Sequence, residues 1–187
     1  MLLASSPAGG MLRSGLRLVL RHPVLFAKVH LAFNPGVLYA TPARARRFLF
    51  STSLSDEQVR RHAARLGRES FRAMLDMTYS RPNVDHIRRQ GCPMLVLGAA
   101  DDVIVPPADV EDTARAYGAP SAIFPSMGHD MMLDTHWERV AEHIGRWLVE
   151  TVSRSPGVDG RSQSTAPANT ALHPTPSASL ARRSQRG

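Results

Sequence analysis

The sequence predicts an α/β fold with a few parallel strands and flanking helices, preceded by a block of short helices. Residues 94–97 form a short continuous apolar run that ends at Gly98, which is typical of a strand buried on both faces. A helix is expected over residues 107–117, because a proline occupies its first position and Gly118 follows its last turn. A second apolar run follows at 122–124. Strand, helix and strand at this spacing indicate two parallel strands joined by a crossover.

A final helix is expected after the second strand. Val140, Ile144, Trp147 and Leu148 recur at helical spacing and would form one apolar stripe. Asp134 precedes this stripe and is a residue type that often caps a helix N-terminus. The sequence therefore predicts that Asp134 caps the last helix.

The region before the strands, residues 11–90, is predicted to consist of short helices. Thr41 and Pro42 resemble an N-cap followed by a first-turn proline. Ser55 and Gln58 have the spacing of a capping box, in which the side chain of each residue accepts a hydrogen bond from the backbone N–H of the other. The expected breaks between the helices are Pro23, Pro35 and Pro82.

Four segments are expected along the chain. Residues 1–10 would form a first core strand and a turn, and residues 11–90 a block of short helices. Residues 91–151 would form the carboxyl-terminal α/β core. Residues 152–187 are rich in Ser, Pro and Arg and contain no aromatic residue, so we expect a disordered tail that cannot bury enough apolar surface to fold.

The net charge of +7 is unevenly distributed. Residues 1–55 contain six Arg, one Lys and no acidic residue, whereas residues 56–151 contain eleven Arg and fifteen acidic residues. Nucleic-acid-binding proteins concentrate basic charge on the recognition element itself. The predicted α/β core is acidic, so we expect no nucleic-acid partner.

The cysteine content and the hydropathy restrict the compartment. Cys92 is the single cysteine, which excludes an intramolecular disulfide and suits a reducing, cytoplasmic location. No run of 18 apolar residues occurs, so no transmembrane helix is expected.

Residues 11–33 alternate apolar and basic residues, as a helix on an anionic membrane would. The alternative, which we prefer, is a lid helix over a substrate pocket.

Two polar groups follow the two predicted strands of the core. Asp101 and Asp102 come after the first strand, and His129 comes after the second. The carboxyl ends of parallel strands lie at the same edge of a sheet, and functional groups of open α/β sheets gather there. An aspartate that orients a histidine acting as general base would suit this placement.

These residues resemble the α/β-hydrolase family. The resemblance covers about residues 1–150 and is closest after residue 91, in segments 93–106 and 124–134 and in a closing helix with two tryptophans. It implies a partial α/β-hydrolase fold in which residues 11–90 are the helical cap or lid. His129 would be the triad base and Asp102 the triad acid, with Asp101 as the alternative. It also implies a serine-type, esterase- or lipase-like hydrolase of acyl esters or other hydrophobic substrates, without metal or organic cofactor.

The resemblance further implies that the chain begins partway through the hydrolase domain, so that the nucleophile elbow and the oxyanion hole are absent. Ser6 is a poor nucleophile candidate because Pro7 has no N–H to donate to an oxyanion. Ser5 lacks the small flanking residues of a tight elbow, and Ser126 follows the acid. We therefore expect a chain that is inactive alone. The alternative is a non-catalytic remnant or binding module that pairs with a partner chain.

Several other side chains have two interpretations. Met127, Met131 and Met132 could line an acyl pocket, but methionines at such positions more often fill a core. His136 and His143 lie seven residues apart on the predicted final helix. They lack carboxylate or cysteine neighbours and are interpreted as surface residues, so no metal site is expected.

Overall fold

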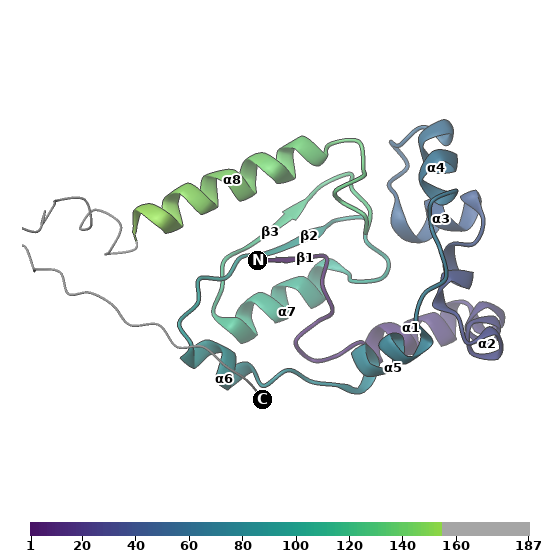
Figure 1. The fold of residues 1–187 in the computed structure, drawn as a ribbon, viewed down its shortest axis with the longest axis horizontal. Coiled ribbons are helices and arrows are strands. Elements are labelled where there is room, and N and C mark those ends of the chain that lie inside the picture. Colours follow the sequence, from purple (N-terminus) through teal and green to yellow (C-terminus); the bar gives the residue numbers. More distant parts are fainter. Residues whose placement is uncertain (155–187) are drawn as a thin grey trace, which may run out of the picture. The chain divides into compact units, whose positions relative to one another are not determined.

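The computed structural model describes residues 1–154, which form a small parallel sheet covered on both faces by helices, with a further group of helices at one end of the sheet (Figure 1). The predicted disordered tail lies outside the described residues, apart from its first three positions. The strands are β1 (Leu2–Leu3), β2 (Val96–Ala99) and β3 (Ser121–Phe124). The helices are α1 (Leu12–Arg21), α2 (Pro23–Ala32), η1 (Pro35–Tyr39), α3 (Pro42–Leu49), α4 (Asp56–Ala63), α5 (Phe71–Tyr79), α6 (Val84–Arg89), α7 (Pro107–Tyr117) and α8 (Trp137–Ser153).

The sheet has the strand order β1-β2-β3, and both pairs are parallel. Val96 lies opposite Ser121, and Ala99 lies opposite Phe124, so β2 and β3 end at the same edge. A small parallel sheet with flanking helices confirms the predicted α/β class. The predicted parallel relation of the two core strands is also confirmed.

The predicted and observed bounds of the core elements differ little. Helix α7 has the predicted bounds, and Gly118 ends it in the left-handed region with φ of 64°. Strand β2 begins two residues later than the predicted run 94–97, because its pairing with β3 starts at Val96. Leu95 is nevertheless buried, and its carbonyl accepts a hydrogen bond from the Leu2 N–H at 2.7 Å.

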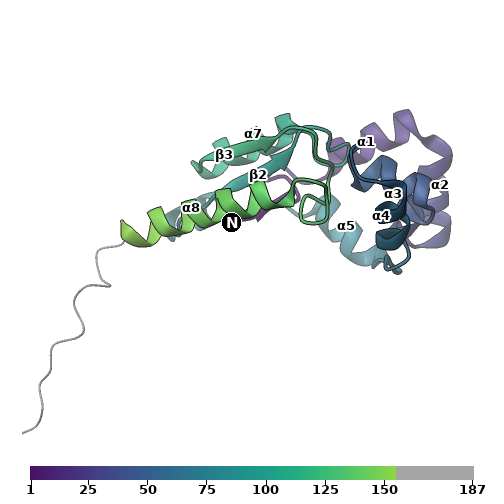
Figure 2. The ribbon, with the colours of Figure 1, turned by 90° about the horizontal axis from the view of Figure 1, so that it is seen from above.

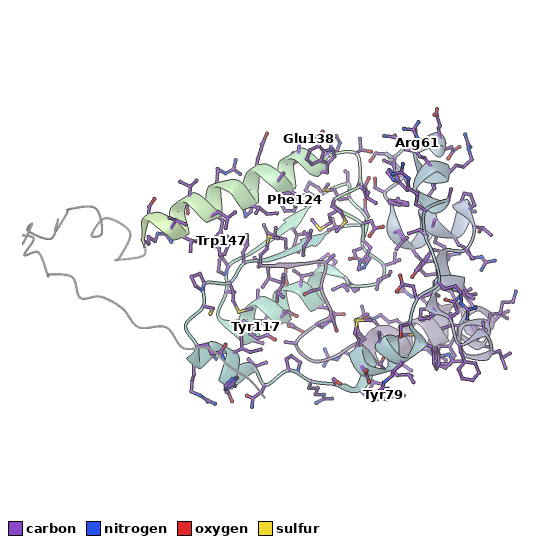
Figure 3. All side chains as sticks on the ribbon, in the orientation of Figure 1. Arg61, Tyr79, Tyr117, Phe124, Glu138 and Trp147 are labelled. Atoms are coloured by element: carbon purple, nitrogen blue, oxygen red, sulfur yellow. The ribbon has the colours of Figure 1, made fainter. Side chains whose placement is uncertain are left out.

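Helices α7 and α8 cover opposite faces of the sheet (Figures 1 and 2). Alternate residues of β2 point to opposite sides, as the pleat of a strand requires. The α8 side buries a core that includes Leu97, Phe124 and Val140, and Trp147 packs against it (Figure 3). The α7 side buries Val96 against Val110.

The last helix differs from its prediction at the N-terminus. Helix α8 starts at Trp137, its N-cap position is His136, and no side chain caps it. The prediction that Asp134 caps this helix is therefore wrong. Asp134 is buried and turns its carboxylate toward Ser51 and Gly128, because those backbone N–H groups are within its reach. Helix α8 continues through Ser153, two residues into the segment predicted as a tail.

The apolar stripe of α8 is only partly buried. Val140 is in the core, and Ile144 and Trp147 pack against it. Leu148 is 49% exposed, so the predicted four-residue stripe narrows toward the carboxyl end of the helix.

Helices α1–α5 and η1 form a group of their own, here called the helical group. The predicted caps are confirmed: Thr41 Oγ1 accepts a hydrogen bond from the Arg44 N–H, and Ser55 and Gln58 form a complete capping box. The helical group has a separate apolar core built from Ala45, Phe48, Leu49, Phe50, Leu54 and Val59.

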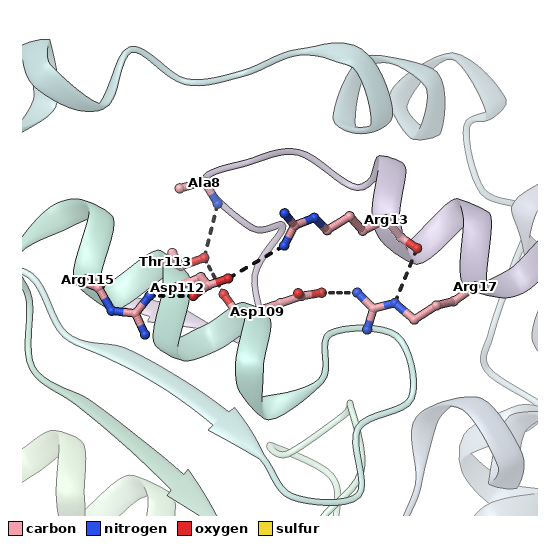
Figure 4. A network of polar contacts seen from close by, with 7 residues as sticks. All are labelled: Ala8, Arg13, Arg17, Asp109, Asp112, Thr113 and Arg115. Carbon is pink, nitrogen blue, oxygen red and sulfur yellow. Dashed lines mark hydrogen bonds and ion pairs between the residues drawn. The ribbon is translucent and has the colours of Figure 1, made fainter.

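Helix α1 contacts α7 through polar side chains (Figure 4). Arg17 pairs with Asp109 at 2.5 Å, and Arg13 lies 3.9 Å from Asp112. Leucines on α1 remain more than half exposed, namely Leu12, Leu16 and Leu20. None of the helices formed by residues 1–154 combines the length and the apolar character needed to cross a bilayer. Whether α1 covers a substrate pocket or lies on a membrane stays a prediction.

We expect Gly98→Ala to destabilise the protein. A Cβ at Gly98 would lie 2.5 Å from Val110 Cγ2, so that α7 would have to shift away from β2. Overpacking of this kind costs about 1–3 kcal/mol. Denaturant unfolding should show this loss, whereas Gly145→Ala on α8, where nothing lies within 4 Å, should leave stability equal or higher. Equal stability of Gly98→Ala and wild type would contradict the close contact of α7 and β2.

Candidate functional site

Asp102 lies on the loop that follows β2, and the loop itself fixes its carboxylate. Oδ1 accepts hydrogen bonds from the Ile104 N–H at 2.8 Å and from the Val105 N–H at 2.9 Å. An aspartate that binds backbone N–H groups two and three residues ahead is a local turn device. The Asp102 side chain is 0% exposed, so its other oxygen, Oδ2, has a defined direction.

His129 lies on the loop that follows β3 and meets this second oxygen. Its Nδ1 is 2.8 Å from Asp102 Oδ2, and its side chain is 22% exposed. Asp102 Oδ2 can act as the acceptor for an Nδ1–H, which leaves Nε2 unprotonated in the neutral ring. No side chain among residues 1–154 is hydrogen-bonded to Nε2. The predicted contact between the two loops is thus present.

The structure distinguishes the two candidate acids. Asp101 is exposed, and its backbone N–H donates to the Met127 carbonyl at 3.0 Å. Within the described residues its carboxylate makes no hydrogen bond to His129. Asp102 is therefore the carboxylate that contacts the imidazole. The catalytic roles assigned to Asp102 and His129 stay predictions.

Burial and charge act in opposite directions on His129. Burial of the imidazole lowers its pKa. The hydrogen bond and charge of Asp102, together with the charge of Asp130, raise the pKa by more than burial lowers it. The pKa of His129 therefore lies above the ordinary value of 6.5. Burial also raises the pKa of the Asp130 carboxyl, against the lowering effect of His129 and His62. The site therefore favours a protonated imidazole more than water does.

The helical group packs directly against the His129 loop. A Cβ at Gly128 would lie 2.6 Å from the Leu49 carbonyl oxygen, so only glycine fits beside this backbone. On the other side of His129, the Asp130 N–H donates to the same carbonyl at 2.8 Å. The end of α3 and the loop that carries the imidazole are in direct contact.

Two buried polar residues near this contact were not recognised from the sequence. Ser51 had no pattern that singled it out, and Asp134 was assigned as a helix cap. The spacing of Asp134, five residues after His129 on the same loop, is the one sequence feature that places it near the site.

The remaining candidates lie away from the Asp102–His129 pair or are structural. Met127 and Met131 are fully buried in the core and Met132 is half exposed, so the core interpretation of the first two is confirmed. His136 is exposed, and His143 packs edge-on against Phe124 at 5.7 Å. Residues 1–154 contain no group of three or more His, Cys, Asp and Glu side chains able to hold a metal ion.

None of the serine hydroxyls in the part of the chain that the structure describes is hydrogen-bonded to His129. Ser6 and Ser126 are exposed, and Ser5 is partly buried. Ser126 has φ of 58°, a left-handed conformation in the turn between β3 and Gly128. The site as described contains an acid and a base.

Comparison with known structures gives a distant likeness to an esterase. A solved structure of a thermophilic esterase from Thermogutta terrifontis with malate bound is similar to 80% of this chain and to 53% of that chain, with 22% identity and a TM-score of 0.45. The chain thus spans about half the length of that esterase. No protein-family model and no curated protein matches the sequence. The fold and the site define an α/β protein with an aspartate–histidine pair at the carboxyl edge of its small parallel sheet.

We expect Asp102→Asn to lower the pKa of His129 below its ordinary value. The substitution removes the charge and weakens the hydrogen bond that raise this pKa, while the lowering effect of burial remains. An NMR titration of the His129 ring protons measures the change. Asp101→Asn is the matched control and should leave the midpoint unchanged. Equal midpoints for the two variants would contradict the assignment of Asp102.

The stability of the folded state should depend on pH through His129. Because its folded pKa is raised above 6.5, protonation stabilises the folded state fully below pH 6.5, and this stabilisation is lost as the pH rises through the raised value. His129→Gln should remove this part of the pH dependence in denaturant unfolding. His86→Gln, at an exposed histidine of α6, should retain it. A wild-type profile in His129→Gln would refute the link between His129 and stability.

Proposed function

We propose that this chain carries the acid and base of a serine-type hydrolase of the α/β-hydrolase family, of the esterase- or lipase-like kind that acts on acyl esters. The observation that carries the proposal is the 2.8 Å contact between Asp102 Oδ2 and His129 Nδ1. A buried carboxylate that orients an imidazole is the arrangement that a serine hydrolase uses to activate its nucleophile. The position of both groups at the carboxyl edge of a parallel sheet supports the same proposal.

The proposed chemistry uses the free nitrogen of His129. Asp102 would hold the imidazole in the Nδ1–H tautomer, and Nε2 would take the proton of a serine hydroxyl as that oxygen attacks the ester carbonyl. The resulting imidazolium would be stabilised by Asp102 and would return the proton to the leaving alcohol. The raised pKa of His129 supports its role as proton acceptor.

We further propose that the serine and the oxyanion-hole donors lie on residues outside this chain, which would then be inactive alone. The observation that supports this is the absence, within residues 1–154, of any serine hydroxyl bonded to His129. Ser6 is followed by Pro7, which cannot donate an N–H to an oxyanion. The substrate would be a small acyl ester or another hydrophobic molecule.

A second candidate function is a non-catalytic binding module that pairs with a partner chain. The observation that favours it is the position of β1 at the edge of the sheet. The N–H groups of Leu2 and Ala4 donate to the carbonyls of Leu95 and Leu97. The N–H and carbonyl of Leu3 therefore face the open side of the sheet, where a further strand could pair. In this alternative His129 has no chemical role in the assembled complex.

Hydrolysis of p-nitrophenyl acetate tests the proposed function. The chain alone should hydrolyse the ester no more than about tenfold faster than His129→Ala, because an isolated acid–base pair lacks the oxyanion hole that supplies much of the rate. A rate far above His129→Ala would contradict the proposal that the nucleophile lies elsewhere.

A second experiment tests whether the chain contributes to catalysis once a nucleophile is supplied. It joins the chain to the polypeptide encoded directly upstream of it, in whichever frame contains Gly-x-Ser-x-Gly. The joined protein should hydrolyse the ester and react with a fluorophosphonate, and both activities should fall at least about a thousandfold in His129→Ala. Asp101→Asn should retain them. A folded joined protein whose hydrolysis does not depend on His129 would favour the binding module.

A further inference from the structure

Asp134 is a buried carboxylate whose hydrogen-bond partners are all backbone N–H groups or a hydroxyl. It is 1% exposed, and none of the ion pairs formed by residues 1–154 includes it. Oδ2 accepts from the Ser51 N–H at 2.8 Å and from the Gly128 N–H at 2.7 Å. Oδ1 accepts from the Ser51 Oγ–H at 2.6 Å and from the Thr135 N–H at 2.8 Å. Each oxygen therefore has two donors.

Ser51 presents its two donors from a segment that is itself fixed. It is 2% exposed and follows Phe50, the C-cap residue of α3. Its carbonyl accepts a hydrogen bond from Arg46 Nη1 at 3.1 Å, and its Oγ is 2.7 Å from Ser53 Oγ. The Asp134 carboxylate thus joins a rigid part of the helical group to the loop after β3.

Gly128 directly precedes His129 in the chain, so the bond between the Gly128 N–H and Asp134 bears on the position of the imidazole. Asp134 binds the backbone on one side of His129, and the Leu49 carbonyl binds the Asp130 N–H on the other side. The backbone is therefore held on both sides of His129, at the peptide group between Met127 and Gly128 by Asp134 and at the peptide group between His129 and Asp130 by Leu49. Their position sets the direction in which His129 Nδ1 points.

We propose that Asp134 and Ser51 are positioning residues that hold the His129 loop at hydrogen-bond distance from Asp102. A buried carboxylate without a cation is costly unless all its bonds are made, which here requires residues 51, 128 and 134 to keep one arrangement. A shift of the loop by about 1 Å would take the 2.8 Å contact between Nδ1 and Oδ2 out of hydrogen-bond range. The catalytic importance of this positioning rests on the proposed function. The positioning itself is tested on the Asp102–His129 contact, without any activity measurement.

Exchange of the His129 Nδ1 proton with water, followed by NMR, tests the proposal in the full chain. In Ser51→Ala and in Asp134→Asn the exchange should be about tenfold faster or more, and the pKa of His129 should fall, because the bond to Asp102 opens more often. Asp109→Asn is the matched control. Asp109 is also a buried carboxylate, and through Arg17 it joins the helical group to the α/β core. It lies on α7 away from His129, so the exchange rate of the Nδ1 proton and the pKa of His129 should both stay at their wild-type values in Asp109→Asn.

The two variants separate positioning from other effects. Ser51→Ala keeps every charge, so a fall of the His129 pKa in this variant comes from a changed contact with Asp102. If Asp134→Asn does not fold, Ser51→Ala decides the outcome alone. Wild-type exchange and titration in a folded Ser51→Ala would overturn the proposal and leave Asp134 as a structural link. Neither readout requires turnover, so failure of the ester-hydrolysis proposal is a separate result.

Discussion

The parallel pairing of β2 and β3 determines where the Asp102–His129 pair lies. It places Ala99 opposite Phe124, so the loops after the two strands leave the sheet at the same edge. Asp102 lies three residues beyond one strand end and His129 five residues beyond the other. Because the backbone of the first loop binds one oxygen of Asp102, the second oxygen is directed at the imidazole. The pair thus follows from strand direction and local turn chemistry.

The helical group is attached to the α/β core in two physically different ways. Near the His129 loop, the contacts of Leu49 and Ser51 are buried hydrogen bonds to backbone and carboxylate groups. Between α1 and α7, the contacts are arginine–aspartate pairs, of which the one formed by Arg13 is largely exposed. Exposed ion pairs contribute little to stability, and buried hydrogen bonds to a carboxylate contribute more. Both attachments therefore include a buried carboxylate that accepts hydrogen bonds, Asp134 near His129 and Asp109 on α7, and the exposed Arg13 pair adds little.

Local patterns in the sequence predicted most of the fold and the pair itself. The caps at Thr41 and Ser55 and the glycine stop of α7 depend on residues within four positions of each other. The proximity of Asp102 and His129 followed once two parallel strands were inferred. Asp134 could not be placed in this way, because an aspartate just before a helix has the same local pattern whether it caps the helix or not. Its partner Ser51 is 83 residues away, and no short-range pattern encodes such a contact.

The tautomer of neutral His129 shows whether Asp102 orients the imidazole, because the Asp102 carboxylate can only accept a hydrogen bond from a protonated Nδ1. The ¹⁵N chemical shifts of the two ring nitrogens, measured above the imidazole pKa, report which one carries the proton. We expect a protonated Nδ1 and an unprotonated Nε2. A protonated Nε2 in the folded chain would contradict this expectation, since the imidazole would then neither donate to Asp102 nor serve as a base at its open side.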